Sequence, residues 1–188
     1  MLGWGGSGVS PCRSVEALVR LVEASAPRNL CTVLLVEDGG LPDAAGVRMS
    51  AECCREIDAL PIGPGVGACG TAAFLKQPVM IEDAETDVLM KDFREVVQRY
   101  GIKACWSTPV LSSAGEVIAT FAIYSLTPRR PQVRDLALVD TAVRLTRIAL
   151  EKHRAEAALL GSEARFRELA ENVGDGFYNR DAGSGRVR

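Results

Sequence analysis

Residues 61–75 read PIGPGVGACGTAAFL, and the fold depends on how this stretch is interpreted. It contains the pattern G-x-G-x-x-G at Gly65, Gly67 and Gly70, with Cys69 inside it. Such a pattern is compatible with a phosphate-binding loop of a dinucleotide enzyme, with a tight backbone bend, or with a thiol site. The residues on either side decide among these possibilities.

The flanking residues argue against a nucleotide-binding loop. A dinucleotide fingerprint needs a hydrophobic strand directly before the first glycine and a long helix after the last one. Here a helix-like segment and two prolines precede the loop, and only a short apolar run separates Gly70 from Pro78. A Walker-type loop is excluded because no Lys-Ser or Lys-Thr pair follows. We expect the glycines to serve backbone bending, with direct ligand contact as the alternative.

The rest of the chain predicts helices and strands joined mostly by tight turns. Ser14 and Thr86 or Asp87 are candidate helix N-caps, and Gly101 is expected to end a helix. Sequential strands joined by turns favour an α+β fold with an antiparallel sheet over a parallel one. Helices are expected over 14–26, 51–60, 71–75, 86–101 and 133–171. Strands are expected over 30–38, 47–50 and 78–83. Residues 103–126 are expected to form a hairpin that turns at 112–115.

Composition excludes several classes of protein. The chain has 188 residues, 47% hydrophobic and 24% charged, with a formal net charge of −2. These values are typical of a soluble globular protein and give no reason to expect nucleic-acid or membrane binding. The apolar run at 117–126 is shorter than the roughly 18 residues of a membrane span, and residues 1–13 do not resemble a signal peptide. We expect disorder over 1–13 and a cytoplasmic location.

Metal binding is not expected. The six cysteines show no C-x-x-C spacing, and the chain has one histidine, His153. In a cytoplasmic chain such cysteines are expected to be free thiols, several of them small core residues. A zinc site is therefore disfavoured.

Five motifs together resemble a GAF domain of bacterial sensory proteins. They are the loop G-x-G-x-C-G-x-A, the strand V-x-I-E-D, a helix closed by Y-G, the run A-C-W-S-T-P, and the strand G-x-V-x-x-T-F-A-I-Y. The resemblance covers about residues 14–155 and is to the type at the front of sensor histidine kinases and cyclic-di-GMP signalling proteins. It implies a PAS-like, six-stranded antiparallel sheet flanked by helices, with a pocket roofed by the glycine loop and the two helices after it. We assign residues 14–150 to this domain.

The resemblance suggests where a ligand pocket would lie. Strand alternation places Cys105 and Ser107 on one face of the sheet and Trp106 and Thr108 on the other, without showing which face lines the pocket. Asp83 is expected to cap the following turn or to contact a ligand. Ala119, Phe121 and Ile123 share a face expected to be core. The candidate pocket residues are Gly67, Cys69, Phe74, Asp83, Phe93, Cys105, Trp106 and Thr108.

The sequence does not identify a cofactor. Haem-binding members need an axial histidine, and His153 lies on the C-terminal helix, so haem is disfavoured. Bilin-binding members attach the pigment to a cysteine usually beside a histidine or an aromatic residue and carry a separate acidic motif. No histidine adjoins Cys69 or Cys105, so bilin is disfavoured too. The N-K-x-F-D-E-type signature of cyclic-nucleotide-binding members is absent.

Three functions are compatible with the resemblance. The favoured one is a non-catalytic sensory domain that detects a small molecule or a redox change, since Cys69 and Cys105 can face each other as a redox-sensitive pair. The second is a thiol enzyme similar to free methionine-(R)-sulfoxide reductase, which shares the run C-G-T-A at 69–72. That family's attacking cysteine lies before the penultimate strand, where this chain has none over 83–103. The third is a dimerisation scaffold whose pocket its own side chains fill.

The C-terminal part predicts a signalling helix. We assign residues 151–171 to a signalling helix. From Ile148 onward the spacing is heptad-like, with Ile148, Ala155, Leu159 and Phe166 along one seam that is imperfect because Lys152 and Ser162 are polar. We expect a parallel homodimer through this helix, with a single amphipathic connector as the alternative. Residues 172–188 resemble the start of a PAS domain, too short to close a core and therefore expected to be disordered here. An output domain is expected to follow in a longer protein.

Overall fold

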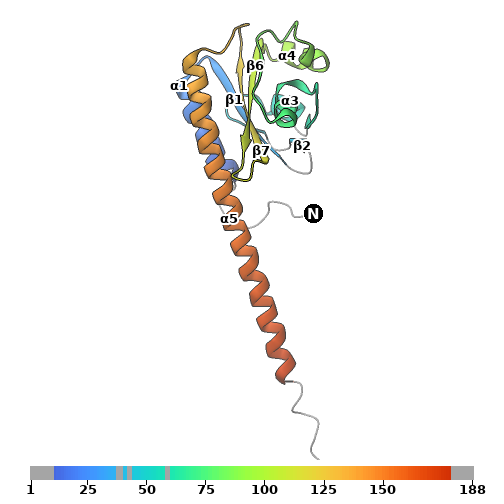
Figure 1. Cartoon of the computed structure of the whole chain (residues 1–188), viewed down its shortest axis with the longest axis vertical. Coiled ribbons are helices and arrows are strands. Elements are labelled where there is room, and N and C mark those ends of the chain that lie inside the picture. Colours follow the sequence, from blue (N-terminus) through green and yellow to red (C-terminus); the bar gives the residue numbers. More distant parts are fainter. Residues whose placement is uncertain (1–10, 37–39, 42–43, 58–59, 179–188) are drawn as a thin grey trace, which may run out of the picture. The chain divides into compact units, whose positions relative to one another are not determined.

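The core of the protein is a five-stranded antiparallel sheet (Figure 1). The computed structural model describes residues 11–36, 40–41, 44–57 and 60–178. The strand order is β3-β1-β7-β6-β5, and every neighbouring pair is antiparallel. The α+β fold with an antiparallel sheet is therefore confirmed. The strands are β1 (Asn29–Leu35), β3 (Ala44–Gly46), β5 (Val79–Ile81), β6 (Ala104–Leu111) and β7 (Val117–Ser125).

The expectation of six strands in one sheet is wrong for the described residues. The remaining strands, β2 (Gly40–Leu41) and β4 (Leu60–Pro61), pair with each other instead of extending the main sheet. Each is two residues long, and Pro61 has no N–H to donate to a ladder, so this pair has little capacity to add further strands. The helix expected over 51–60 correspondingly ends at Ile57.

The hairpin partner of β1 lies slightly earlier than expected. It is β3 at Ala44–Gly46 rather than residues 47–50. Gly46 lies opposite Thr32, where an added Cβ would be 3.0 Å from the Thr32 side chain. Arg48 then leaves the sheet and donates hydrogen bonds to the carbonyls of Pro27 and Asn29.

The helices differ from expectation mainly at their ends. Helix α1 starts at Pro11, so Ser14 lies inside it rather than at its N-cap; proline is well suited to a first helical turn. Residues 86–101 form a 3₁₀ helix followed by α4, and Asp87 is the N-cap, accepting from the Leu89 N–H at 2.9 Å. The helical elements are α1 (Pro11–Ser25), α2 (Ala51–Ile57), α3 (Gly67–Leu75), η1 (Val88–Phe93), α4 (Arg94–Arg99) and α5 (Val133–Tyr178).

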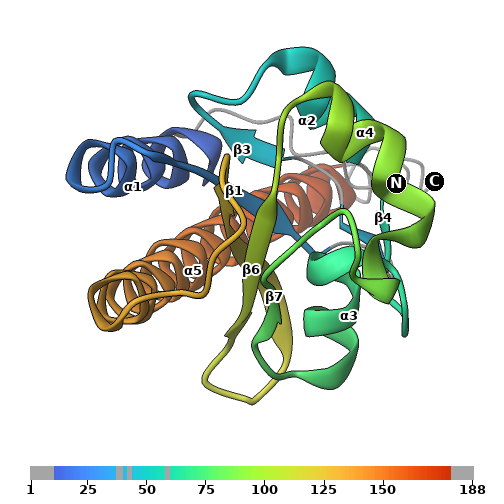
Figure 2. The same cartoon turned by 90° about the horizontal axis from the view of Figure 1, so that it is seen from above.

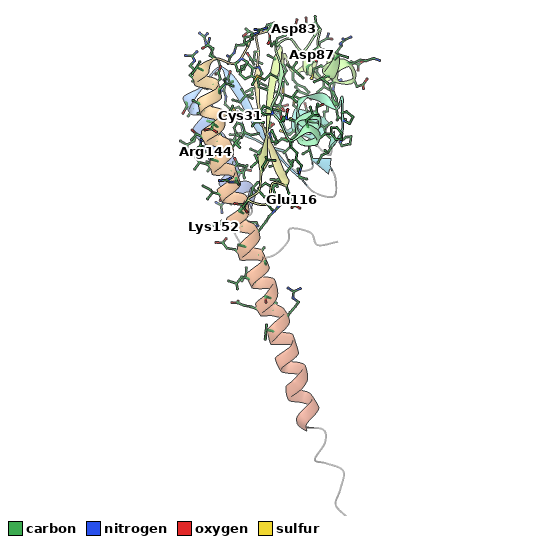
Figure 3. The ribbon with its side chains drawn as sticks, viewed as in Figure 1. Cys31, Asp83, Asp87, Glu116, Arg144 and Lys152 are labelled. Carbon is green, nitrogen blue, oxygen red and sulfur yellow. The ribbon has the colours of Figure 1, made fainter. Side chains whose placement is uncertain are left out.

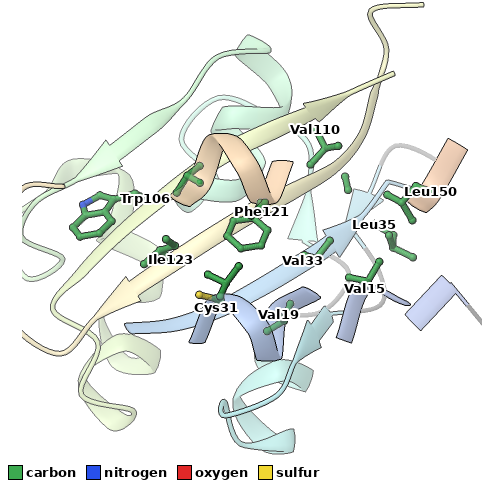
Figure 4. Close-up of a cluster of buried hydrophobic side chains, with 14 of the residues drawn as sticks. Val15, Val19, Cys31, Val33, Leu35, Trp106, Val110, Phe121, Ile123 and Leu150 are labelled. Atoms are coloured by element: carbon green, nitrogen blue, oxygen red, sulfur yellow. The ribbon is translucent and has the colours of Figure 1, made fainter. Parts of the chain in front are cut away.

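The sheet separates two hydrophobic cores. Helix α1 and the start of α5 cover one face, and α3 and α4 cover the other (Figure 2). On the first face, Phe121 and Ile123 share a fully buried core with Ala119, as expected, and pack with Val19 of α1 (Figure 4). On the second face, side chains such as Leu34 and Ile81 fill the space beneath α3. Alternation along each strand assigns successive residues to opposite cores.

Helix α5 continues beyond the predicted end at Glu171. It runs to Tyr178 and so includes part of the segment 172–188 for which disorder is expected, while residues 1–10 and 179–188 lie outside the described residues. No proline interrupts the helix, and glycine weakens a helix without ending it. The chain divides into a unit ending at Leu150 and a second unit starting at Glu151. Among the described helices, none has the length and apolarity needed to span a membrane.

Candidate functional site

The glycine-rich stretch forms a turn over 63–66 and, directly after it, the first turn of α3. The helix starts at Gly67, four residues earlier than expected. Gly65 and Gly67 have φ values of +80° and +52°, which residues with side chains rarely adopt. Gly70 is required for a different reason: an added Cβ would lie 2.7 Å from the Pro61 carbonyl oxygen and 2.8 Å from the Val66 Cβ. These glycines therefore let α3 pack directly against β4 and the sheet.

Beneath α3 the structure gathers five buried side chains with thiol or hydroxyl groups. We call Cys69, Cys105, Ser107, Thr120 and Tyr124 the thiol–hydroxyl cluster. Cys69 comes from α3, and the other members come from the α3 face of β6 and β7, where Cys105 lies opposite Tyr124. The Tyr124 hydroxyl lies 3.9 Å from the Cys69 sulfur and 3.1 Å from the Thr32 hydroxyl. Cys69 and Cys105 are thiols rather than a disulfide.

Two hydroxyls of the cluster are buried without a hydrogen-bond partner among the described residues. Ser107 Oγ and Thr120 Oγ1 are shielded from solvent and have no hydrogen-bond partner of ordinary geometry among the described residues. A buried polar group without a partner costs about 1–3 kcal/mol. Both hydroxyls nevertheless lie close enough to Cys69 to favour its ionised form. Their arrangement therefore suits a negative charge or a hydrogen-bond acceptor placed between them.

The cluster makes Cys69 the more acidic of its two thiols. The thiol of Cys105, followed by the nearby hydroxyls of Ser107, Tyr124 and Thr120, outweighs the effect of burial and lowers the pKa of Cys69 to about 7. The pKa of Cys105 is raised well above its ordinary value because it shares its proton with Cys69 and is buried. Burial, and then the charge of Cys69, raise the pKa of Tyr124. Cys69 is thus the group that ionises first.

Two thiols outside the cluster, Cys31 and Cys53, behave as core residues. Burial raises the pKa of Cys31 to about 12, with the charge of Glu23 adding to the effect, and burial raises the pKa of Cys53 to about 11. Cys31 belongs to β1 and is part of the core on the first face (Figure 4). A buried thiol of raised pKa is a poor nucleophile.

The raised pKa of Cys31 predicts a loss of stability in alkali. A thiol that ionises near pH 9 when unfolded but near 12 when folded stabilises the fold fully below pH 9, and this contribution disappears between pH 9 and 12. The free energy of unfolding, measured in urea, should fall with pH above pH 9 in the wild type. We expect Cys31→Ala to make this fall less steep by about 1.4 kcal/mol per pH unit. An unchanged slope would contradict the assignment, whatever stability the substitution removes at pH 7.

Trp106 and Thr108 were expected in the pocket, and the structure places them on the other side of the sheet from Cys105. Trp106 is buried in the first core, and the guanidinium of Arg129 lies 4.4 Å from the centre of its ring. Neighbouring residues of a strand point to opposite faces, so neither residue can share a site with Cys105. The indole N–H of Trp106 has no hydrogen-bond partner among the described residues.

The remaining expected pocket residues, Asp83, Phe74 and Phe93, do not belong to the cluster. Asp83 Oδ1 accepts from the Glu85 N–H at 3.0 Å and thus caps a turn after β5 (Figure 3). Phe74 is 53% exposed. Phe93 is half-buried in the second core, and its ring approaches the backbone at Gly67.

Sequence reasoning did not identify Thr120 and Tyr124. The available signal was the spacing of hydroxyl-bearing residues at alternate positions of an otherwise apolar strand, T-x-x-x-Y over 120–124. Ser107 was placed on the face of Cys105 but was not recognised as a site residue.

A resident metal has no evident site in the described part of the chain. No group of three or more His, Cys, Asp or Glu side chains there is arranged to hold a metal ion. His153 belongs to the unit that starts at Glu151, whereas the thiol–hydroxyl cluster belongs to the first unit.

An antiparallel sheet with the first and last helices on one face and shorter helices on the other is the arrangement of GAF domains. The GAF domain family model matches residues 13–150, and the chain belongs to this family. It is 33% identical over 177 residues to the methyl sulfide methyltransferase-associated sensor of Methanosarcina acetivorans, a match that covers 93% of this chain. The chain spans 18% of that relative's length.

Solved structures show the same fold at lower identity. A domain of a protein described as a two-component sensor histidine kinase from Sinorhizobium meliloti 1021 superposes with a TM-score of 0.64 at 20% identity, covering 78% of this chain and 94% of that one. The type II free methionine-R-sulfoxide reductase of Thermoplasma acidophilum superposes with a TM-score of 0.62 at 15% identity, covering 76% and 93%. The fold is thus shared by sensors and by an enzyme, and the site must distinguish between them.

Proposed function

We propose that this chain is a non-catalytic sensory GAF domain in which the thiol–hydroxyl cluster receives the signal and α5 passes it to a following output domain. The observation that carries the proposal is the pair of unpaired hydroxyls, Ser107 and Thr120, that converge with two thiols beneath α3. A structural core gains nothing from unpaired hydroxyls, whereas a site that receives an acceptor group does. The relative from Methanosarcina is named a sensor, which supports the proposal.

Two kinds of signal fit this cluster. The first is a small molecule with an acceptor group, which would give Ser107 and Thr120 their missing partner. The second is oxidation by a hydroperoxide. In that reaction the Cys69 thiolate attacks a peroxide oxygen and becomes a sulfenic acid, releasing water or an alcohol; Cys105 then displaces water to form a disulfide. Two electrons leave the thiols and reduce the peroxide.

Intact-mass measurement tests the proposal and separates the two signals. The chain is purified from its host under native conditions, and its mass is compared with that of a Ser107→Ala, Thr120→Val variant. A bound molecule present only in the wild type supports a ligand signal. Loss of two hydrogen atoms after peroxide treatment, mapped to a Cys69–Cys105 disulfide, supports a redox signal. Neither result in the folded protein would contradict an input site at the cluster and favour the scaffold alternative.

The thiol-enzyme alternative rests on the lowered pKa of Cys69 beside Cys105. It predicts turnover of free methionine sulfoxide with dithiothreitol as the reductant, lost in Cys69→Ser. The burial of both thiols argues for sensing rather than turnover, since substrate must reach a catalytic thiol repeatedly. Measurable turnover by the wild-type chain would replace the sensory proposal with the enzymatic one.

We further propose that α5 pairs with a second copy of this chain. Ile148, Leu159 and Phe166 are 56%, 61% and 74% exposed, and Ala155 is exposed with them. These residues follow the heptad-like spacing of a two-stranded coiled coil, in which a partner helix would cover them. A cytoplasmic location and a PAS-like segment after residue 171, before the output domain, complete the proposed organisation.

The dimer is tested by sedimentation velocity. We expect Leu159→Lys combined with Phe166→Lys to convert a dimer into a monomer, because two buried apolar contacts per helix would be replaced by charges. Glu163→Lys, exposed and outside the seam, is the matched control and should leave the dimer intact. A wild-type chain that sediments as a monomer at high micromolar concentration would show that α5 is a single amphipathic connector.

A further inference from the structure

A cavity of about 960 Å³ lies away from the thiol–hydroxyl cluster. It is formed where α1 ends, β1 begins, β7 ends and α5 begins, and all its lining residues belong to the unit ending at Leu150. This volume is in the range of small-molecule sites. Three of its lining residues are arginines, Arg28, Arg129 and Arg134, against a single carboxylate, Asp135.

The polar wall of the cavity is held in place by its own hydrogen bonds. Arg129 donates to both carboxylate oxygens of Asp135, at 2.6 and 3.4 Å, and to Asn29 Oδ1 at 3.0 Å. The Arg129 guanidinium also lies over the ring of Trp106. Asn29 and Asp135 are only 3% and 4% exposed. This network joins β1, β6 and the first turn of α5, so the wall is preorganised rather than formed by loose surface chains.

The charge on the wall is not balanced within the protein. Asp135 is already paired with Arg129, whereas Arg28 and Arg134 have no ion-pair partner among the described residues. Both are exposed at the cavity. Leu126, which is 52% exposed, and half-buried Leu138 add an apolar area beside them. Guanidinium groups bind carboxylates and phosphates in a two-pronged geometry.

From this lining we infer that the cavity binds a small organic anion. Arg28 and Arg134 hold its carboxylate or phosphoryl group, and Leu126 and Leu138 contact its apolar part. The site is distinct from the input site proposed above, because Asn29 and Ser125 line it at one end of the sheet whereas Cys69 and its neighbours lie beneath α3. It therefore does not depend on the proposed sensory role of the cluster.

Occupancy of this cavity would act on the beginning of α5. Asp135 is in the first turn of that helix and accepts from the Gln132 N–H at 2.8 Å as well as from Arg129. An anion in the cavity offers Arg129 a second negatively charged acceptor, in addition to the neutral Asn29 oxygen, and so competes with Asp135 for the guanidinium. The cavity is thus placed where a bound anion alters the first turn of α5.

Binding of three probes of similar size tests the inference. Phenyl phosphate, benzoate and the cation benzamidine are titrated into the chain, and two-dimensional NMR follows the backbone signals of Asn29, Ser125 and Leu138. We expect saturable shifts with at least one anion and none with benzamidine. Phenyl phosphate alone would assign a phosphoryl ligand, and benzoate alone a carboxylate ligand. Either arginine variant, Arg28→Gln or Arg134→Gln, should weaken binding about tenfold.

The matched control is Arg147→Gln, which removes an equal charge from an exposed position of α5 outside the cavity. It should leave the affinity unchanged. The inference would be overturned if neither anion gave saturable shifts of the backbone NMR signals at probe concentrations up to about 10 mM, which detects even weak binding. Equal weakening by Arg147→Gln would do the same, since it would show attraction to net charge alone.

Discussion

Replacing Gly70 with alanine is expected to destabilise the domain by about 3 kcal/mol. The added methyl group would lie 2.7 Å from the Pro61 carbonyl oxygen and 2.8 Å from the Val66 Cβ, both closer than atoms can approach without movement. Neither is the end of a flexible side chain, so α3 must shift away from β4 and from the core beneath it. Urea unfolding followed by the fluorescence of buried Trp106 measures the loss.

Gly63→Ala provides the control for this experiment. Its added Cβ would lie 3.6 Å from the nearest side-chain atom of Val66, an ordinary contact distance. We expect a change within about 0.5 kcal/mol, as for a surface substitution. Similar losses in both variants would mean that the stretch resists any side chain and that the contact of Gly70 with β4 is not the cause.

Asp135→Asn is expected to cost about 2 kcal/mol at pH 7. The Asp135 side chain is 5% exposed and pairs with Arg129, which is 26% exposed, so the substitution leaves a partly buried guanidinium without its counter-charge. The value is below that for a fully buried pair because solvent reaches Arg129. Burial alone would raise the pKa of Asp135, but hydrogen bonds from Arg129 and the Gln132 N–H outweigh it and lower the pKa below 3.8.

The lowered pKa determines how this loss depends on pH. Stabilisation by the ionised carboxylate is present above pH 3.8 and is lost as the pH falls through the folded-state pKa, so the difference between wild type and Asp135→Asn should shrink in acid. Asp140→Asn is the control, because Asp140 and its partner Arg144 are 61% and 70% exposed. An exposed pair of this kind contributes well under 1 kcal/mol. Equal effects of the two substitutions would contradict a structural role for the Arg129–Asp135 pair.

Local sequence patterns predicted those parts of the fold that depend on local chemistry. The glycine at 101 ends a helix with a φ of +67°, and Asp87 caps one, as their residue types indicate. Gly70 is different, because position 70 must be glycine only on account of its contact with Pro61, a residue of another element. A local pattern cannot reveal such a contact. The two-residue strands β2 and β4 are too short to show any periodicity.

The candidate site was predicted only in part, because alternation along a strand is local whereas the position of the strand in the fold is not. Alternation correctly separated Cys105 from Trp106, but the side of the sheet that carries α3 depends on chain connections and not on the strand itself. Pairing Cys105 with Tyr124 requires the register of β6 and β7. Counting outward from the turn at 112–115 would misplace that register, because an irregularity at Val110 and Leu111 shifts it by one residue.

The central claim is that Ser107 and Thr120 are placed to support a negative charge or an acceptor group at Cys69. Thiolate absorbance at 240 nm, measured against pH, tests it most directly. We predict an ionisation near pH 7 in the wild type. It should disappear in Cys69→Ser and move upward in Ser107→Ala, Thr120→Val, in which the sulfur loses two nearby hydroxyls that favour its ionised form. A folded wild-type chain with no thiol ionising below pH 8.5, or an ionisation unchanged by loss of both hydroxyls, would contradict the claim.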